Sequence, residues 1–270
     1  MTFEVLVATM GQNDLSLRQK MNIERDVLIA NQCGQWRYDE EEREFGRVRM
    51  ISSDTRGVGV NRNLALTISK ADIVLFADDD VTYYDSDVHG VLDAFRELPD
   101  ADVILFGIDM TRGGEVFDKR RNKVRRLRLH NALKYGAARM AVRRSALLKH
   151  NLAFSTLFGG GCIYSSGEDS LFLRECFAAG LRVYSHSYVL GACAKDSSTW
   201  FNGFNEKYMF DKGAWVACAF PKAKHIIKWY FIHRFAKKSD LPISIVIRNF
   251  NRGIRAFATL EDFDGNTHEA

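Results

Sequence analysis

Three consecutive aspartates, Asp78, Asp79 and Asp80, stand directly after an apolar run at residues 72–77. Adjacent carboxylates raise each other's pKa, so clustering them at a strand end is costly unless they share a cation. Hard cations such as Mg²⁺ or Mn²⁺ take oxygen ligands and often keep phosphate oxygens in their shell. Side chains two apart in an extended chain point the same way, so we expect Asp78 and Asp80 to face one ligand and Asp79 to point elsewhere. An acidic turn that caps a following helix is the alternative.

A second acidic motif, Gly167-Glu168-Asp169, opens a stretch with helical spacing at residues 167–180. Acidic side chains at a helix N-terminus interact favourably with the helix dipole, which is a purely structural interpretation. A carboxylate on a rigid helix start can also act as a general base toward an incoming hydroxyl. The motif is therefore a candidate catalytic site.

A third motif, RGVGVNRN at residues 56–63, places two glycines and two arginines around the start of a predicted helix. Glycines allow close approach of a backbone, and helix N-termini beside arginine attract phosphate. The segment matches neither common phosphate-binding glycine motif, so a helix start with solvent-facing arginines is an equal alternative.

Five short apolar runs predict the strands that position these motifs. They lie at residues 3–9, 26–30, 48–52, 72–77 and 102–106. Nearly continuous apolar runs are typical of strands buried on both faces, as in a parallel sheet. Helical spacing between them, at 61–69 and 88–98, predicts an α/β layered fold whose ligands bind beyond the carboxyl ends of the strands. Residues 112–134 are predicted to form a basic loop or an exposed helix.

The charges are unevenly distributed along the 270 residues, although the net charge is only +4. Residues 1–118 carry 12 basic and 23 acidic side chains, whereas residues 119–150 carry 12 basic and no acidic ones. An acidic front suits cation binding, and a basic zone suits phosphates, nucleic acid or an anionic membrane. Length and pattern together predict one large domain with a C-terminal extension from about residue 200.

The cysteines and the N-terminus indicate the cellular compartment in which the protein is expected. Five cysteines without a CxxC pair indicate neither a zinc ribbon nor a disulfide framework, and favour a reducing compartment. The N-terminus lacks the basic start of a signal peptide, and no run of 18 apolar residues occurs. We therefore expect a soluble or peripheral protein of the cytoplasm.

Together, the motifs resemble those of family 2 glycosyltransferases with the GT-A fold, of the bacterial polysaccharide-assembly type. The resemblance covers roughly residues 3–195: RGVGVNRN is similar to the family's glycine-then-RN segment, and Asp78-Asp79-Asp80 looks like its DxD motif. AARMAVRRS at 137–145 looks like the strand that closes the sheet, and 158–161 and 167–169 look like the glycine loop and the ED motif. The resemblance implies a Rossmann-like, mostly parallel central sheet flanked by helices over residues 1–199, and a helical C-terminal extension at 200–270.

The family implies inverting transfer of a sugar from a nucleoside-diphosphate sugar, with a UDP-sugar favoured. The acceptor would be a hydroxyl of a glycan or lipid-linked glycan in cell-surface polysaccharide synthesis. By this resemblance, Asp80 would bind a divalent metal, Mn²⁺ or Mg²⁺, with Asp78 near the ribose and the metal's water shell, and Asp169 would be the base. The remaining implied site residues are Thr9, Asp54, Arg62 and Asp79 around the nucleotide, and Gly160, Gly161 and Glu168 on the sugar and acceptor side.

Two positions depart from the family pattern. The second strand ends in Ala30-Asn31-Gln32, where relatives often have an acidic residue that contacts the base. The segment 188–195 has no histidine, where many relatives have a metal ligand, and the upstream His186 fits a structural role better. Metal binding would then rest on Asp80, the diphosphate and water.

The back of the chain holds two aromatic segments. Residues 198–213 fit an amphipathic helix docked on the core, and Trp200 is the candidate acceptor contact among them. Residues 222–238 interleave basic and aromatic side chains, which is typical of an interfacial helix on an anionic membrane or of a core helix with snorkelling lysines.

Two other functions fit part of the sequence. A nucleotidyltransferase also uses clustered aspartates and a divalent ion, but it needs a glycine-rich loop after the first strand, where only Gly11 stands. A nucleic-acid-binding module would use the basic zone at 119–150, but no RRM, KH or helix-turn-helix signature accompanies it, so nucleic acid is the less favoured partner.

Overall fold

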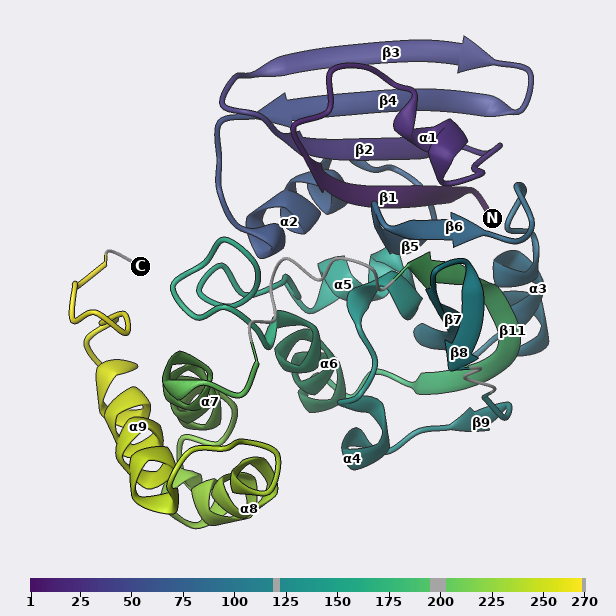
Figure 1. The fold of residues 1–270 in the computed structure, drawn as a ribbon. Helices are drawn as coiled ribbons and strands as arrows, with labels where there is room; N and C mark the ends of the chain where they lie inside the picture. The colour runs from purple at the N-terminus through teal and green to yellow at the C-terminus, as the bar shows by residue number, and fades with distance from the viewer. Residues whose placement is uncertain (119–121, 195–202, 269–270) are drawn as a thin grey trace.

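The computed structural model describes residues 1–118, 122–194 and 203–268, which form a large mixed sheet flanked by helices (Figure 1). The strand order is β3-β4-β2-β1-β5-β10-β7-β11-β6, with β8 paired to β7 and β9 paired to β11. The strands are β1 (Phe3–Met10), β2 (Val27–Gln32), β3 (Arg37–Arg43), β4 (Gly46–Ser53), β5 (Ile73–Asp78), β6 (Val81–Tyr83), β7 (Val103–Arg112), β8 (Glu115–Asp118), β9 (Arg125–Arg126), β10 (Met140–Arg143) and β11 (Val183–Ala194).

The centre of this sheet is Rossmann-like and mostly parallel, as predicted. Strands β4, β2, β1 and β5 are parallel neighbours, and β7 and β11 form a second parallel pair. Strand β10 joins the two groups by pairing antiparallel with both β5 and β7. The register places Ala8 opposite Asp78 and Thr9 opposite Asn31, so polar residues at the carboxyl ends of different strands meet at one edge.

Side chains alternate between the two faces of the sheet and build two cores. Val5 and Val7 of β1 point into a core shared with α1 and α3, whereas Leu6 points into a core shared with α2, α5 and α6. The helices of the described residues are α1 (Leu17–Lys20), α2 (Val58–Ile68), α3 (Gly90–Glu97), α4 (Leu129–Ala132), α5 (Arg144–Lys149), α6 (Glu168–Ala178), α7 (Glu206–Ala219), α8 (Lys224–Ala236) and α9 (Ile243–Ala256), with a 3₁₀ turn η1 (Ala137–Arg139).

The C-terminal helices α7, α8 and α9 lie together beyond α6 (Figure 1). Helices α7 and α9 approach closely, because a Cβ on Gly253 of α9 would collide with the carbonyl oxygen of Phe210 on α7. A third hydrophobic core includes Phe210 and Phe250 from these helices together with Tyr164 and Leu171 from the preceding segment. The C-terminal helices are thus packed against the start of α6.

The structure confirms the predicted strands and adds others that lack an apolar run. β3 is an edge strand of mostly charged residues, and its pairing with β4 is set by the hairpin rather than by hydrophobic alternation. The interpretation of residues 112–134 as a basic loop or exposed helix is wrong for the short strands β8 and β9, whereas α4 is a helix of 4 residues within this stretch. The strand expected within 137–145 is β10. None of the helices in the described ranges is long and apolar enough to cross a membrane.

Candidate active site

The carboxyl ends of the parallel strands carry the first half of the site. The hydroxyl of Thr9 at the end of β1 donates a hydrogen bond of 2.5 Å to Asp79. The side-chain amide of Asn61 in α2 donates to the carbonyl oxygens of Thr9, at 3.1 Å, and Ala30, at 2.8 Å. These bonds tie α2, and with it the neighbouring Arg62, to the ends of β1 and β2.

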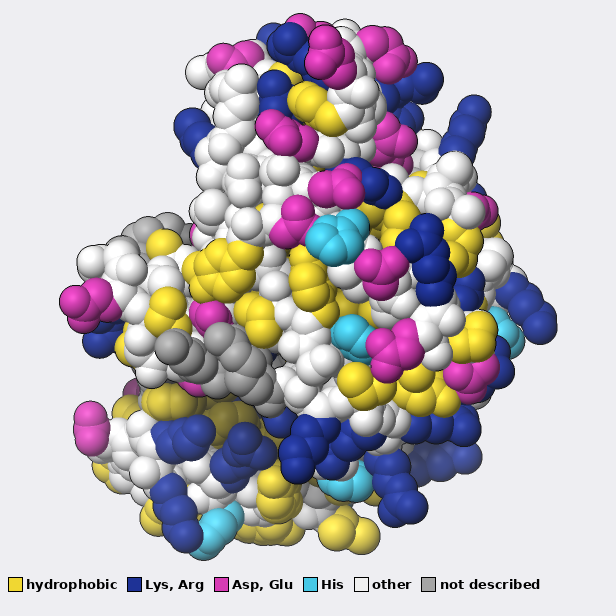
Figure 2. Space-filling view, turned by 90° about the vertical axis from the view of Figure 1, so that its right-hand side faces the viewer, with side chains coloured by type: hydrophobic (Ala, Val, Ile, Leu, Met, Phe, Trp, Pro, Cys, Tyr) yellow, Lys and Arg dark blue, Asp and Glu magenta, His cyan; other side chains and the backbone are white. Residues whose placement is uncertain are grey.

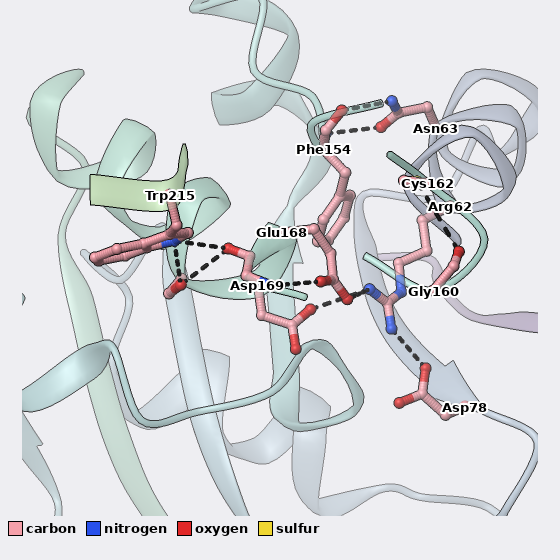
Figure 3. Close-up of polar contacts among 11 residues, drawn as sticks. Arg62, Asn63, Asp78, Phe154, Gly160, Cys162, Glu168, Asp169 and Trp215 are labelled. Atoms are coloured by element: carbon pink, nitrogen blue, oxygen red, sulfur yellow. Dashed lines mark hydrogen bonds and ion pairs between the residues drawn. The ribbon is translucent and has the colours of Figure 1, made fainter. Parts of the chain in front are cut away.

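Arg62 is the hub that joins the two acidic motifs (Figure 3). One guanidinium nitrogen, Nη2, lies 2.7 Å from Asp78, and the other, Nη1, lies 3.1 Å from Glu168 and 3.0 Å from Asp169. The Arg62 side chain is only 4% exposed, and its guanidinium also lies over the ring of Phe154. One buried guanidinium thus faces three carboxylates.

The start of α6 is fixed by its glycine and by a tryptophan from α7. Gly167 precedes the helix with φ 121°, a left-handed conformation that favours glycine. The indole of Trp215 packs against this glycine, and its Nε1 donates to the Gly167 carbonyl, at 3.3 Å, and to Ser170 Oγ, at 3.1 Å. Glu168 and Asp169 therefore project from a helix start that Trp215 of α7 holds in place.

The environment of Asp169 suits a base. Burial raises the pKa of Asp169 well above its usual range, and the charges of Glu168 and Asp78 raise it further. The Arg62 guanidinium and a backbone hydrogen bond from Ala137 act in the opposite direction and lower that pKa. The Asp169 side chain remains 28% exposed, so a substrate hydroxyl can reach it. A more basic carboxylate that solvent can reach is able to accept a proton from a hydroxyl.

The three consecutive aspartates have three different partners. Asp78 pairs with Arg62, Asp79 accepts the Thr9 hydroxyl, and Asp80 accepts a hydrogen bond of 3.3 Å from the thiol of Cys193 on β11. Burial raises the pKa of Asp80, and the nearby Asp78 and Asp79 add to this effect. An excess of carboxylate charge at a strand end is the environment that a divalent cation would relieve.

The donor set fits a divalent metal only if a substrate completes it. In the described ranges, no three His, Cys, Asp or Glu side chains are gathered so that they could hold an ion. Asp78 and Asp80 offer hard oxygen ligands, the kind that Mg²⁺ and Mn²⁺ prefer. His186 instead pairs with Glu97 of α3, with 3.0 Å between Nε2 and Oε2. The residues present therefore suit a cation that takes its other ligands from diphosphate and water.

The glycine loop bridges α2 and the acidic helix start. The backbone N–H of Val58 donates to the Gly160 carbonyl at 2.9 Å. A Cβ on Gly159 would lie 2.6 Å from Val58 Cγ1 and 2.9 Å from the carboxyl carbon of Glu168, so only glycine fits there. Gly161, with φ 81°, lies against Gly57. Gly160 and Gly161 thus hold the beginning of α2 in place next to Glu168.

Asp54 and Trp200 also belong to the predicted site, and Asn31 stands where the sequence departs from the family pattern. Asp54 is exposed just past the end of β4. Asn31, at the strand end where relatives often have an acid, is buried and uses its amide on the backbone of Gln12, at 2.8 and 2.9 Å. Trp200 lies outside the described residues.

Some residues beside the site were missed by sequence reasoning. Trp215 holds Gly167, and Lys212 on the same helix donates to Ser166 Oγ at 3.1 Å. Burial lowers the pKa of Lys212, while the charges of Asp211 and Glu168 oppose this effect. The aromatic composition of residues 198–213 was a signal for contacts near the site, but Trp215 lies just beyond that segment and no local pattern marked it.

Comparison with known proteins decides the family. The sequence profile of glycosyl transferase family 2 matches residues 16–155, which is more than half of the chain. The chain belongs to glycosyl transferase family 2. The match favours a glycosyltransferase over the nucleotidyltransferase and nucleic-acid-binding alternatives. A search of curated proteins found no match.

Solved structures of S. aureus TarS have a similar fold. TarS 1-349 in complex with UDP-GlcNAc has a TM-score of 0.57 at 15% identity, over 96% of this chain and 72% of that one. TarS 1-349 alone has a TM-score of 0.57 at 16% identity, with the same coverage. At these identities the likeness shows the fold, which is GT-A, and the enzyme is therefore a GT-A glycosyltransferase of family 2.

Proposed function

We propose that this glycosyltransferase inverts the anomeric centre of a nucleoside-diphosphate sugar that it transfers to a hydroxyl acceptor. The observation that carries the proposal is the position of Asp169, a partly exposed carboxylate with a raised pKa, joined through Arg62 to Asp78 at the end of β5. A base on one side and an acidic strand end on the other are the two parts that an in-line displacement needs.

In this reaction, Asp169 accepts the proton of the acceptor hydroxyl while the hydroxyl oxygen attacks the anomeric carbon. The bond from that carbon to the diphosphate oxygen breaks, and the diphosphate leaves with the bonding electrons. Attack on the face opposite to the leaving group inverts the configuration. A divalent cation, Mn²⁺ or Mg²⁺, held by Asp80 with Asp78 beside it, would supply positive charge to the diphosphate.

The other residues of the site divide between donor and acceptor. We assign the surroundings of the nucleotide to Thr9, Asp54, Arg62 and Asp79, and those of the sugar and acceptor to Gly160, Gly161, Glu168 and Trp200. A UDP-sugar is the favoured donor, since the similarly folded TarS is described in complex with UDP-GlcNAc. Residues 1–199 would form the transferase domain, and the extension at 200–270 would lie on the acceptor side.

The acceptor that we propose is a glycan or lipid-linked glycan of cell-surface polysaccharide synthesis, reached from the cytoplasmic leaflet. A peripheral position at the membrane would bring the base to a hydroxyl that is anchored there. The acceptor-side assignment of the C-terminal extension is consistent with Trp215 of α7, which holds the start of the base helix.

Thermal stabilisation tests the donor part of the proposal. The protein is heated with UDP, GDP, CMP or dTDP, each with Mn²⁺ and with EDTA, because a ligand that binds the native state raises Tm. We expect a metal-dependent shift with one diphosphate, lost in Asp80→Ala. Asp93→Ala is the matched control, since Asp93 is exposed on α3 and pairs with Arg96. Absence of any shift with folded protein would refute donor binding.

A further inference from the structure

Helix α8 presents one continuous exposed stripe that ordinary core packing does not explain. Its exposed residues recur at helical spacing and are His225, Ile226, Trp229, Tyr230, His233 and Arg234. Three of them are large and apolar: Ile226 is 78% exposed, Trp229 53% and Tyr230 61%. Large apolar side chains grouped at the surface indicate an interaction site.

The opposite side of α8 supplies the apolar side chains that pack into the third core. Ile232 and Phe235 are buried in the third core, and Ile227 and Phe231 pack against it. Trp229 and Tyr230 belong to neither group. The aromatic composition of residues 222–238 therefore divides between an inward face that packs and an outward face that does not, so the core-helix interpretation accounts for only half of it.

The charged residues of the segment that contains α8 have a single sign. No acidic residue lies between Asp211 and Asp240, and the exposed Lys222 and Lys237 flank the two ends of α8. Figure 2 shows Lys and Arg side chains gathered in a band across the lower part of one side of the molecule. In Figure 1, α4 and β9 lie in the lower part of the molecule, and α8 lies at its lower end. Such a surface complements an anionic partner.

We propose that the exposed stripe of α8 is a docking surface for an anionic lipid bilayer. Tryptophan and tyrosine favour the headgroup boundary, where an amphipathic ring meets both water and acyl chain, and basic side chains beside them attract anionic headgroups. The helix lies in the plane of the interface. The evidence for the contact is the surface of α8. Only its purpose, which is to reach a lipid-linked acceptor, rests on the proposed function.

The test is cosedimentation of the full chain with vesicles of phosphatidylcholine, with and without phosphatidylglycerol. Binding is expected with phosphatidylglycerol and expected to weaken as salt rises. Trp229→Ser with Tyr230→Ser should weaken binding roughly tenfold or more. Arg234→Gln with Lys237→Gln should weaken it about 25-fold at low salt, or about fivefold for each charge.

Matched controls come from the far end of the molecule. Trp36, just before β3, is 58% exposed, so Trp36→Ser removes a similar exposed ring and should leave vesicle binding unchanged. Lys70→Gln with Lys149→Gln removes two exposed charges, one after α2 and one at the end of α5, and should have little effect. An unchanged Tm in each variant shows that the fold is kept.

The outcomes separate this inference from the proposed function. No binding to phosphatidylglycerol vesicles, or equal binding by the Trp229 and Tyr230 double variant, would overturn the docking surface. Self-association that depends on Trp229 and occurs without vesicles would also overturn it, because the stripe would then be a contact between copies. The nucleotide-induced Tm shift is measured in parallel, and its absence in the unaltered protein would count against donor binding alone.

Discussion

Replacing Arg62 with methionine should destabilise the fold and make its stability strongly dependent on pH. Arg62 is 4% exposed and is the shared partner of Asp78, Glu168 and Asp169 at 2.7–3.1 Å. Removing one partner of a buried ion pair costs about 3–5 kcal/mol, because the remaining charge has no compensation. Glu168 is the most enclosed of the three carboxylates and Asp78 the least, so we expect a loss near the middle of that range at neutral pH.

The sign of the pH effect follows from Asp169. Its pKa is already raised in the native state, and the Arg62 guanidinium is the charge that lowers it, so removing Arg62 raises it further. A carboxyl with a raised native-state pKa costs stability above that pKa, and the cost disappears as pH falls through it. The variant should therefore recover part of its free energy of unfolding when the pH is lowered from 7.5 to 5.5.

Urea unfolding at these two pH values measures both effects. Arg62→Met with Glu168→Gln should regain part of the loss at pH 7.5, since one stranded charge is removed. Arg96→Met is the control, because its pair with Asp93 is exposed and should contribute less than about 1 kcal/mol. A loss below about 1 kcal/mol for Arg62→Met that is equal at both pH values would refute the idea that one cation balances the cluster.

Three further predictions concern the base and the packing of the C-terminal helices. Asp169→Asn should lower the rate of sugar transfer about 10²–10⁴-fold and leave the nucleotide-induced Tm shift in place, as measured by diphosphate release; an equal loss of donor binding would argue against a role as base. In the unaltered enzyme, kcat should fall as the pH drops through the raised pKa of Asp169, at a pH clearly above that expected for an ordinary aspartate; a rate that stays constant down to about pH 4 would exclude Asp169 as the titrating base. Gly253→Val should lower the free energy of unfolding by about 1–3 kcal/mol or more, because the new side chain collides with the Phe210 carbonyl, whereas Ser244→Val, at an exposed position of the same helix, should cost less.

The parts of the fold that could be predicted are those with a local signal. The apolar runs that became β1, β2, β5 and β7 are buried on both faces, so composition alone marks them, and the run in β4 alternates between buried and partly buried residues. β3 reads RYDEEER and pairs only through its hairpin with β4, so nothing within the segment identifies it as a strand. Pairing between distant segments decides such strands, and a single sequence does not contain it.

The candidate site also has residues that a local signal marks and residues that no local signal marks. Asp78 and Asp169 stand out because each carboxylate sits at the end or the beginning of a predictable element. Arg62 was assigned to the nucleotide by resemblance, yet its three ion pairs join residues up to 107 positions apart. The contact of Trp215 with Gly167 spans 48 positions and depends on how α7 packs, which no local pattern encodes.

The start of α6, with Glu168 and Asp169, is supported both by the sheet and by the C-terminal helices. From the sheet side, Arg62 holds Glu168 and Asp169 and is itself fixed by Asp78 at the end of β5. From the C-terminal side, Trp215 bonds to the Gly167 carbonyl and to Ser170. A base that must lie within about 3 Å of a hydroxyl gains accuracy from two independent supports. Because one support comes from the sheet and the other from α7, a shift of the C-terminal helices would change the position of Asp169 without altering the aspartates at the strand ends. The proposed contact between α8 and a bilayer would act on the same group of helices, so membrane docking would be connected to the position of Asp169 through the third core.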